Sequence, residues 1–215
     1  MIALDAPVWP EGQQIIAVDP TIGLTLFEDM PQHHGPIIDR ILQEEEQAKL
    51  LRPMFGPHLK CTKIRRPDLW GLPEFDLLNA RAQMLFRQVL KTDQVVTDAC
   101  WANVYRKWSA ISPHSHRRAV ASLVYCLDEG APDPSNPESG QFAFVDPRLK
   151  ACCPFEEGRM TNALCPEFRT GAMLIFPAQM MHYVKTFTGE RPRISVSWNM
   201  NPKPLPGSPT DQNPV

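Results

Sequence analysis

What this sequence lacks excludes several classes of protein. No apolar run approaches the roughly 18 residues that a membrane-spanning helix needs, and the first residues lack the basic-then-apolar order of a signal peptide. The formal net charge is only −2 at pH 7. The chain therefore has no strong field that would attract nucleic acid or an anionic membrane. These absences predict a soluble, cytoplasmic protein with no nucleic-acid or membrane partner.

The cysteines also lack a recognisable pattern, since none of the six forms a C-x-x-C pair. This argues against a zinc ribbon and against a thioredoxin-type redox centre. Cys126 lies in an apolar run and is expected to be a small buried hydrophobe. Cys152 and Cys153 are adjacent in a proline-flanked loop. Reduced loop thiols are favoured there over a redox or metal role shared with Cys165.

The length of 215 residues predicts a single domain with a peripheral layer. We expect that domain to span residues 1–200. Residues 1–94 would provide helical and strand support, and residues 95–200 would form the core that carries the motifs. The tail from residue 201 is rich in proline and poor in apolar residues, which predicts an extended or disordered segment.

The periodicity of apolar residues predicts a mostly β protein with flanking helices, of the α+β class. Helices are expected at 36–51 and 73–91, after two short strand-like runs between residues 13 and 27. Residues 53–67 are expected to be irregular. Further strands are expected at 95–107, 119–127, 140–145, 171–176, 182–187 and 193–200. Many strands without intervening helices are typical of a sandwich or a small barrel.

Three histidines stand out as candidate metal ligands. His114 and His116 are two residues apart, so in an extended segment their imidazoles would point the same way. His182 follows an apolar strand at 172–176 and is the best candidate for a third ligand. The remaining histidines, at 33, 34 and 58, are given no role.

The last predicted strand alternates polar and apolar residues. One face would carry Arg193, Ser195, Ser197 and Asn199, and the other face would carry Ile194, Val196 and Trp198. A guanidinium and a hydroxyl two residues apart suit the binding of a carboxylate.

The order His-x-His, distal His and then Arg-x-Ser resembles that of the iron(II)/2-oxoglutarate-dependent oxygenases, a superfamily that includes prolyl hydroxylases. The chain is most similar to a small group with the segments pHxH…sgvyYl, sG.f.f.dPr and fP…H.v…R.siSfN. Here these segments are PHSHRRAVASLVYCL (113–127), SGQFAFVDPRL (139–149) and FPAQMMHYVKTFTGERPRISVSWN (176–199). The resemblance covers roughly residues 100–200. It implies a double-stranded β-helix, a cupin-like jelly-roll barrel whose mouth holds the metal.

The resemblance also implies an oxidoreductase, a dioxygenase that uses iron(II), 2-oxoglutarate and O2 to oxidise a substrate C–H bond. The implied metal ligands are His114, His116 and His182. The implied contacts to the 2-oxoglutarate carboxylate come from Arg193, Ser195 and either Tyr105 or Tyr125.

One position departs from the superfamily pattern, because most members have Asp or Glu where this chain has His116. Asp146 is an alternative carboxylate ligand, but its segment matches a strand that carries no ligand in the resemblance. Two other functions stay open. One is a three-histidine cupin-type dioxygenase that does not use 2-oxoglutarate, and the other is a non-catalytic metal- or ligand-binding jelly roll.

Two further segments bear on the substrate, a small molecule or a peptide that the sequence does not identify. The long connection at 146–170 is expected to be a lid. A basic cluster, expected to be a solvated surface, contains Lys60, Lys63, Arg65 and Arg66.

Overall fold

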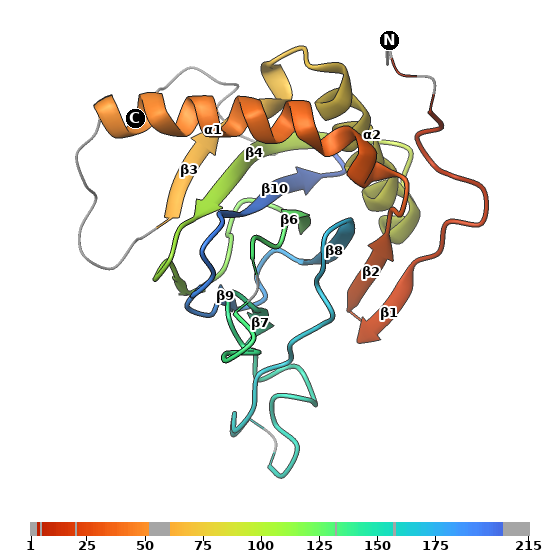
Figure 1. The fold of residues 1–215 in the computed structure, drawn as a ribbon. Coiled ribbons are helices and arrows are strands. Elements are labelled where there is room, and N and C mark those ends of the chain that lie inside the picture. Colours follow the sequence, from red (N-terminus) through yellow and green to blue (C-terminus); the bar gives the residue numbers. More distant parts are fainter. Residues whose placement is uncertain are drawn as a thin grey trace.

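Two antiparallel sheets of unequal size face one another, and helices cover the outer face of the larger one (Figure 1). The computed structural model describes residues 4, 6–19, 21–51, 61–131, 133–156 and 158–203. In the larger sheet the order is β1-β2-β8-β6-β10-β4-β3, and in the smaller sheet it is β5-β9-β7. The strands are β1 (Ile16–Asp19), β2 (Ile22–Leu26), β3 (Cys61–Arg65), β4 (Val96–Tyr105), β5 (Ile111–His114), β6 (Ala121–Asp128), β7 (Phe142–Phe144), β8 (Ala172–Pro177), β9 (His182–Val184) and β10 (Arg193–Asn201).

Both predicted helices are confirmed, as α1 (His34–Leu51) and α2 (Pro73–Leu90). Pro73 lies in the first turn of α2, where its missing N–H costs no helical hydrogen bond. Lys91 ends the helix in a left-handed conformation. Short 3-10 helices, η1 (Met30–His33) and η2 (Pro67–Leu69), precede α1 and α2. Figure 1 shows α1 and α2 above the larger sheet, on the side away from β7 and β9.

The predicted alternation of β10 explains how the larger sheet serves two purposes. Ile194, Val196 and Trp198 are buried in the core formed with the helices, and the Trp198 indole N–H donates to the Asn79 side chain at 3.0 Å. Ser195 and Ser197 line a cavity on the opposite face. One strand thus supports the core and the site together.

Two expectations are corrected by the structure. Residues 61–65 form strand β3 and not an irregular segment, while the preceding residues 52–60, with His58 and Lys60, lie outside the described residues. The strands near 140–145 and 182–187 are shorter than expected, at three residues each. The predicted mostly β fold with flanking helices, a double-stranded β-helix, is confirmed, although its two sheets are not closed into a barrel. The predicted tail also falls mostly outside the described residues.

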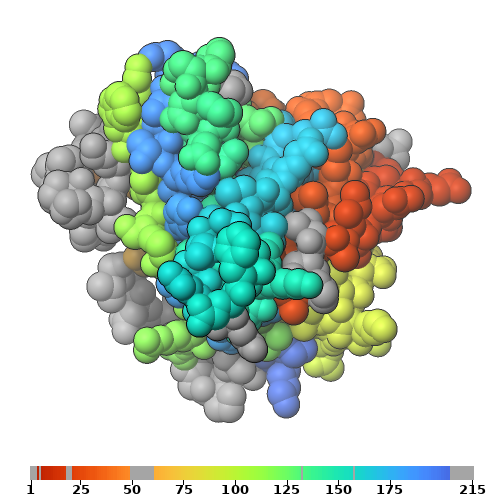
Figure 2. Space-filling model, turned by 90° about the horizontal axis from the view of Figure 1, so that it is seen from below, coloured from red at the N-terminus to blue at the C-terminus, as the bar shows by residue number. Residues whose placement is uncertain are grey.

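The connection at 146–170 projects from the end of the molecule opposite the helices (Figure 1) and stands at the front when the molecule is seen from below, in turquoise (Figure 2). It packs against the smaller sheet through a bridge between Phe144 and Leu164. None of its described residues lines this cavity, but Phe168 packs against Phe142, which does, and lies beside the Arg193 guanidinium, so the lid stays a prediction.

Candidate metal and carboxylate site

The structure brings the three candidate histidines together. One potential ligand atom from each of His114, His116 and His182 lies within 4.8 Å of the other two. His114 and His182 are directly opposite each other on β5 and β9, and their ring centroids are 4.4 Å apart. His116 lies just beyond β5, where its backbone N–H donates to the Ala178 carbonyl at 2.7 Å. Strand pairing therefore aligns two of the imidazoles, and a backbone hydrogen bond places the third.

Two of the rings are held by hydrogen bonds that leave one nitrogen available. Nδ1 of His114 lies 2.9 Å from the Ser112 carbonyl, and Nδ1 of His182 lies 2.8 Å from the Met180 carbonyl. A carbonyl can only accept, so each Nδ1 carries the proton. Each Nε2 then keeps its lone pair, which is the arrangement that a metal-ligating histidine needs.

The surroundings keep two of these imidazoles neutral. Burial lowers the pKa of His182 to about 3, and the neighbouring His114 acts in the same direction. Burial, followed by His114, lowers the pKa of His116 to about 4. Phe176 packs on the His182 ring at 4.8 Å between centroids, and Phe142 stacks on it at 5.5 Å. Neutral imidazoles in a dry setting fit a divalent transition metal such as iron(II).

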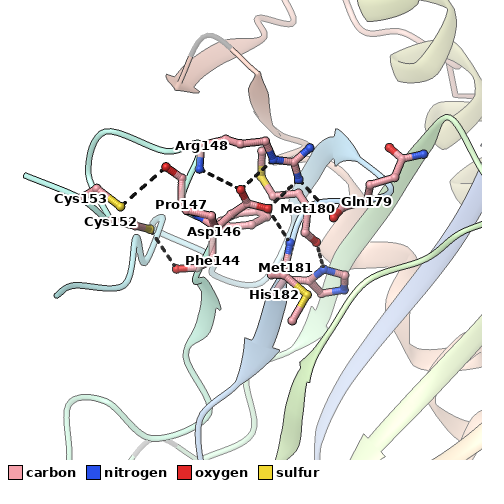
Figure 3. Close-up of polar contacts among 10 residues, drawn as sticks. All are labelled: Phe144, Asp146, Pro147, Arg148, Cys152, Cys153, Gln179, Met180, Met181 and His182. Carbon is pink, nitrogen blue, oxygen red and sulfur yellow. Dashed lines mark hydrogen bonds and ion pairs between the residues drawn. The ribbon is translucent and has the colours of Figure 1, made fainter. Parts of the chain in front are cut away.

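Asp146 is placed outside this cluster and has a different function (Figure 3). Its carboxylate accepts from the Arg148 side chain at 2.7 and 2.6 Å and from the backbone N–H groups of Arg148 and Met181 at 3.0 Å each. These hydrogen bonds lower the pKa of Asp146 to about 2, and the bond from the Arg148 side chain makes the largest contribution. Arg148 also donates to the Gln179 carbonyl at 3.1 Å. Asp146 therefore fixes the turn before His182, and His116 is the residue that completes the cluster with His114 and His182.

Arg193, the first residue of β10, is a buried cation with an unsatisfied donor. Only 4% of the residue is exposed, and its Nη1 has no hydrogen-bond partner among the described residues. The guanidinium carbon lies 4.9 Å from the Tyr105 ring and 5.8 Å from the Phe168 ring. A Cβ at Gly140 would come within 2.9 Å of the Arg193 side chain, so this position accommodates only glycine without a shift. A buried, incompletely paired guanidinium is costly unless an anion binds to it.

The two candidate tyrosines lie on opposite faces of the larger sheet. Tyr105 lines the cavity, opposite Arg193 in the β4–β10 register, and its hydroxyl contacts the Ser195 side chain. Burial raises the pKa of Tyr105, so its hydroxyl stays protonated and can donate. Tyr125 faces the helices, where its hydroxyl lies 2.7 Å from Nε2 of His34. Tyr125 is therefore not positioned to contact a ligand in the cavity.

A cavity of about 780 Å³ between the sheets joins the histidine cluster to Tyr105 and Ser195, the strand neighbours of Arg193. It is lined by the three histidines, by Tyr105 and Ser195, and by residues of β3 that the sequence interpretation assigned to a solvated surface, namely Lys63 and Arg65. The sequence signal for this placement was the spacing of Cys61, Lys63 and Arg65, because side chains two residues apart on a strand share a face.

Comparisons with known proteins agree with this geometry. The model of a family described as "Putative 2OG-Fe(II) oxygenase" matches residues 99–199. The chain has no significant match among the curated proteins. Among the described residues, no helix has the length and apolar character needed to cross a membrane.

Several solved structures share the fold. HygX from Streptomyces hygroscopicus, with nickel and 2-oxoglutarate bound, is 13% identical over 85% of this chain and 82% of that chain, with a TM-score of 0.56. AviO1 from Streptomyces viridochromogenes Tue57 is 14% identical over 86% and 92% of the two chains, with a TM-score of 0.59. A Pseudomonas putida prolyl-4-hydroxylase is 15% identical over 84% and 93%, with a TM-score of 0.53. At these identities the likeness shows the fold.

Proposed function

We propose that the chain is a 2OG-Fe(II) oxygenase, an enzyme that uses iron(II), 2-oxoglutarate and O2, since residues 99–199 match the model of that family. On this premise the following side chains hold each component. His114, His116 and His182 bind the metal through their free nitrogens. Arg193 binds the distal carboxylate of 2-oxoglutarate, and Tyr105 and Ser195 supply further hydrogen bonds. The substrate is a small molecule or a peptide.

The unsatisfied Nη1 of buried Arg193 is the observation that carries this proposal. A carboxylate can accept two parallel hydrogen bonds from a guanidinium, and such charged pairs are stronger than neutral ones. Tyr105 and Ser195 lie beside Arg193 on the same face of the larger sheet, where each can donate to the same carboxylate. Asp146, the acidic residue that could have paired with Arg193, is instead paired with Arg148.

Iron(II), 2-oxoglutarate and O2 together supply the oxidant for a substrate C–H bond, and the protein's contribution is positioning. The Nδ1 hydrogen bonds of His114 and His182 hold the metal-binding nitrogens toward one point. Phe142 and Phe176 exclude water beside His182. Arg193 orients the co-substrate. This division of work requires no general acid or base from the chain.

A third imidazole in place of a carboxylate leaves the metal site one unit more positive. A dianionic co-substrate compensates this charge, and the low polarity around His182 strengthens the attraction between the two. His116 is therefore compatible with 2-oxoglutarate as the co-substrate.

Isothermal titration of 2-oxoglutarate into the Mn(II)-loaded protein tests the assignment. We expect Arg193→Met to weaken 2-oxoglutarate binding by about 30-fold or more, because a charged hydrogen bond contributes about 2 kcal/mol. Arg191→Met is the matched control, since Arg191 is exposed and pairs with Asp128 at the surface. Equal affinity in Arg193→Met would overturn the assignment. O2 consumption by an iron-loaded wild type that does not bind 2-oxoglutarate would instead support the three-histidine dioxygenase.

A further inference from the structure

Strand β3 presents two cations to the cavity. In the β3–β4 register Lys63 lies opposite Asn103 and Arg65 lies opposite Trp101, and all four residues line the cavity. Ile64, between the two cations, points the other way and is buried in the core beneath the helices. The alternation of this edge strand thus separates a core residue from two cavity residues.

A chain of contacts connects these cations to the metal cluster. The Lys63 ammonium lies 4.1 Å from the centroid of the Trp101 ring, and that ring lies 5.5 Å from the His116 ring. Arg193 is at the other end of the sheet face, because its register neighbours are Tyr105 on β4 and, beyond it, Cys61 on β3.

The two cationic ends of this face are well separated. Cys61 and Arg65 are four residues apart, which corresponds to about 13 Å along a strand. Arg193 at one end is proposed to hold 2-oxoglutarate. Arg65 lies at the other end, and Lys63 lies between the two, in the row of Asn103 and Ser195, with its ammonium over Trp101. The two cations on β3 are therefore left for a different ligand. The His116 ring is next to Trp101, at the end where Arg65 lies.

The charges of Lys63 and Arg65 are not balanced within the described part of the chain. No Asp or Glu lines the cavity, and neither cation forms an ion pair there. By contrast, neighbouring Arg66 pairs with Asp68 at 2.8 Å and Arg106 pairs with Glu45 at 2.5 Å. Both side chains are exposed at the cavity. The Lys63 ammonium packs on Trp101, and desolvation there, followed by the charge of Arg65, lowers the pKa of Lys63. Two like charges on one strand face, with no partner, favour an external anion.

We propose that Lys63 and Arg65 bind an anionic group of the substrate, a carboxylate or a phosphate ester, while the rest of the substrate lies along Trp101 toward the metal. Asn103 lies between Lys63 and Ser195 on the same face and offers a side-chain amide for a hydrogen bond. The cavity volume of about 780 Å³ is typical of small-molecule sites. The inference rests on the proposed function for the position of the metal.

Paramagnetic relaxation of small probes tests the inference on protein loaded with Mn(II) and saturating 2-oxoglutarate. The probes are 3-phenylpropionate and phenyl phosphate, with uncharged 3-phenylpropionamide for comparison. We expect the aromatic protons of at least one anion to relax at least fivefold faster than those of the amide in the wild type. The anion that shows the larger effect distinguishes a carboxylate from a phosphate site.

The variants assign the effect to the two cations. Lys63→Met and Arg65→Met should each reduce the preference for the anion over the amide, measured as the ratio of their relaxation rates. The double variant should abolish this preference, and Lys63→Arg should retain it. Lys150→Met removes one exposed cation outside the cavity and should behave as the wild type.

Three results would overturn the inference: equal relaxation of anions and amide, a preference that survives in the double variant, or loss of 2-oxoglutarate binding in that variant. The last result would place the cations on the co-substrate. A wild type that takes up no Mn(II) would contradict the proposed metal site instead.

In that case, saturation-transfer NMR of the same probes on the metal-free wild type and double variant tests the anion site. Loss of the preference for the anion in the double variant supports the site. An unchanged preference overturns it.

Discussion

At the scale of single residues, the hydrogen bond between His34 and Tyr125 decides which tyrosine can serve the cavity. The sequence placed Tyr105 and Tyr125 on strands beside the histidine motif but did not determine which way either faced. His34, at the start of α1, had been given no role because it lies in a proline-rich turn. In the structure it is buried and bonded to the Tyr125 hydroxyl at 2.7 Å. A contact across 91 residues leaves no trace in local sequence patterns.

The burial of His34 makes the stability of the protein depend on pH. Burial is the main cause that lowers the pKa of His34 to about 4, from 6.5 in an unfolded chain. Between these values the unfolded state binds a proton that the folded state does not. Stability is therefore fully retained above pH 6.5 and is lost as the pH falls toward 4, by up to about 3 kcal/mol.

Urea denaturation at pH 7.5, 6.0 and 4.5, compared between the wild type and His34→Gln, measures this loss. We expect the free energy of unfolding of the wild type to fall more steeply with pH than that of the variant. Parallel pH profiles would show that His34 titrates normally in the folded protein.

His116 offers a second test at the residue scale, because it occupies the position where most of the superfamily has a carboxylate. We expect His116→Asp to retain one metal ion per chain, since a carboxylate is also a good ligand for iron(II) and Mn(II). It should weaken 2-oxoglutarate binding several-fold, because the site loses one unit of positive charge. His33→Asp makes the same change outside the cluster and should alter neither the metal content nor the affinity for 2-oxoglutarate. Metal analysis and isothermal titration measure both quantities, and loss of the metal in His116→Asp would remove position 116 from the ligand set.

At the scale of elements, the turn between β8 and β9 determines where His182 lies. Asp146 accepts from the Met181 N–H and is held by Arg148, which itself bonds to the Gln179 carbonyl (Figure 3). The chain thus clamps both ends of the turn that also supplies the Met180 carbonyl to His182. Asp146 is a positioning residue that acts through the backbone.

We expect Asp146→Asn to weaken metal binding by about 10- to 100-fold, the range found when the supports of metal ligands are removed. The asparagine keeps the shape of the side chain but lacks the charge that holds Arg148. Asp93→Asn, at an exposed position away from the cluster, is the matched control. Competition with a metallochromic chelator gives the affinities. An affinity equal to that of the wild type would mean that the turn keeps its shape without the ion pair.

Strands β10 and β3 show which elements could be predicted. On β10 the alternation runs through Arg193, Ile194, Ser195 and onward for nine residues, so both faces were correctly assigned. On β3 the alternation has one buried apolar residue, Ile64, among Cys61, Thr62, Lys63 and Arg65. Such a short edge strand does not differ from a polar loop in its local pattern. The cations that line the cavity were therefore missed.

At the scale of the whole molecule, the histidine motifs predicted which three imidazoles come together, but they did not predict the order of strands in the sheets. The order of strands in the larger sheet places β8 between β2 and β6, three segments that are far apart in the sequence. Periodicity along the chain contains no information on such partners. The resemblance supplied the architecture, and the long-range pairing of β5 with β9 is what brings His114 to His182.

This pairing predicts that ligand binding stabilises the entire fold. The proposed ligands come from β9 and from the segment around β5, while Arg193 comes from β10 of the other sheet, so metal and co-substrate together connect both sheets. A ligand at 100 times its Kd adds about 2.7 kcal/mol to the free energy of unfolding. For a chain of this size that corresponds to a rise in Tm of about 5–10 °C.

Differential scanning fluorimetry with Mn(II) and 2-oxoglutarate should show this rise in the wild type and in Lys150→Met, but not in His182→Ala. Because 2-oxoglutarate alone can also bind to Arg193, the decisive comparison is the extra rise caused by Mn(II) at constant 2-oxoglutarate. The same extra rise in His182→Ala would mean that the metal binds elsewhere.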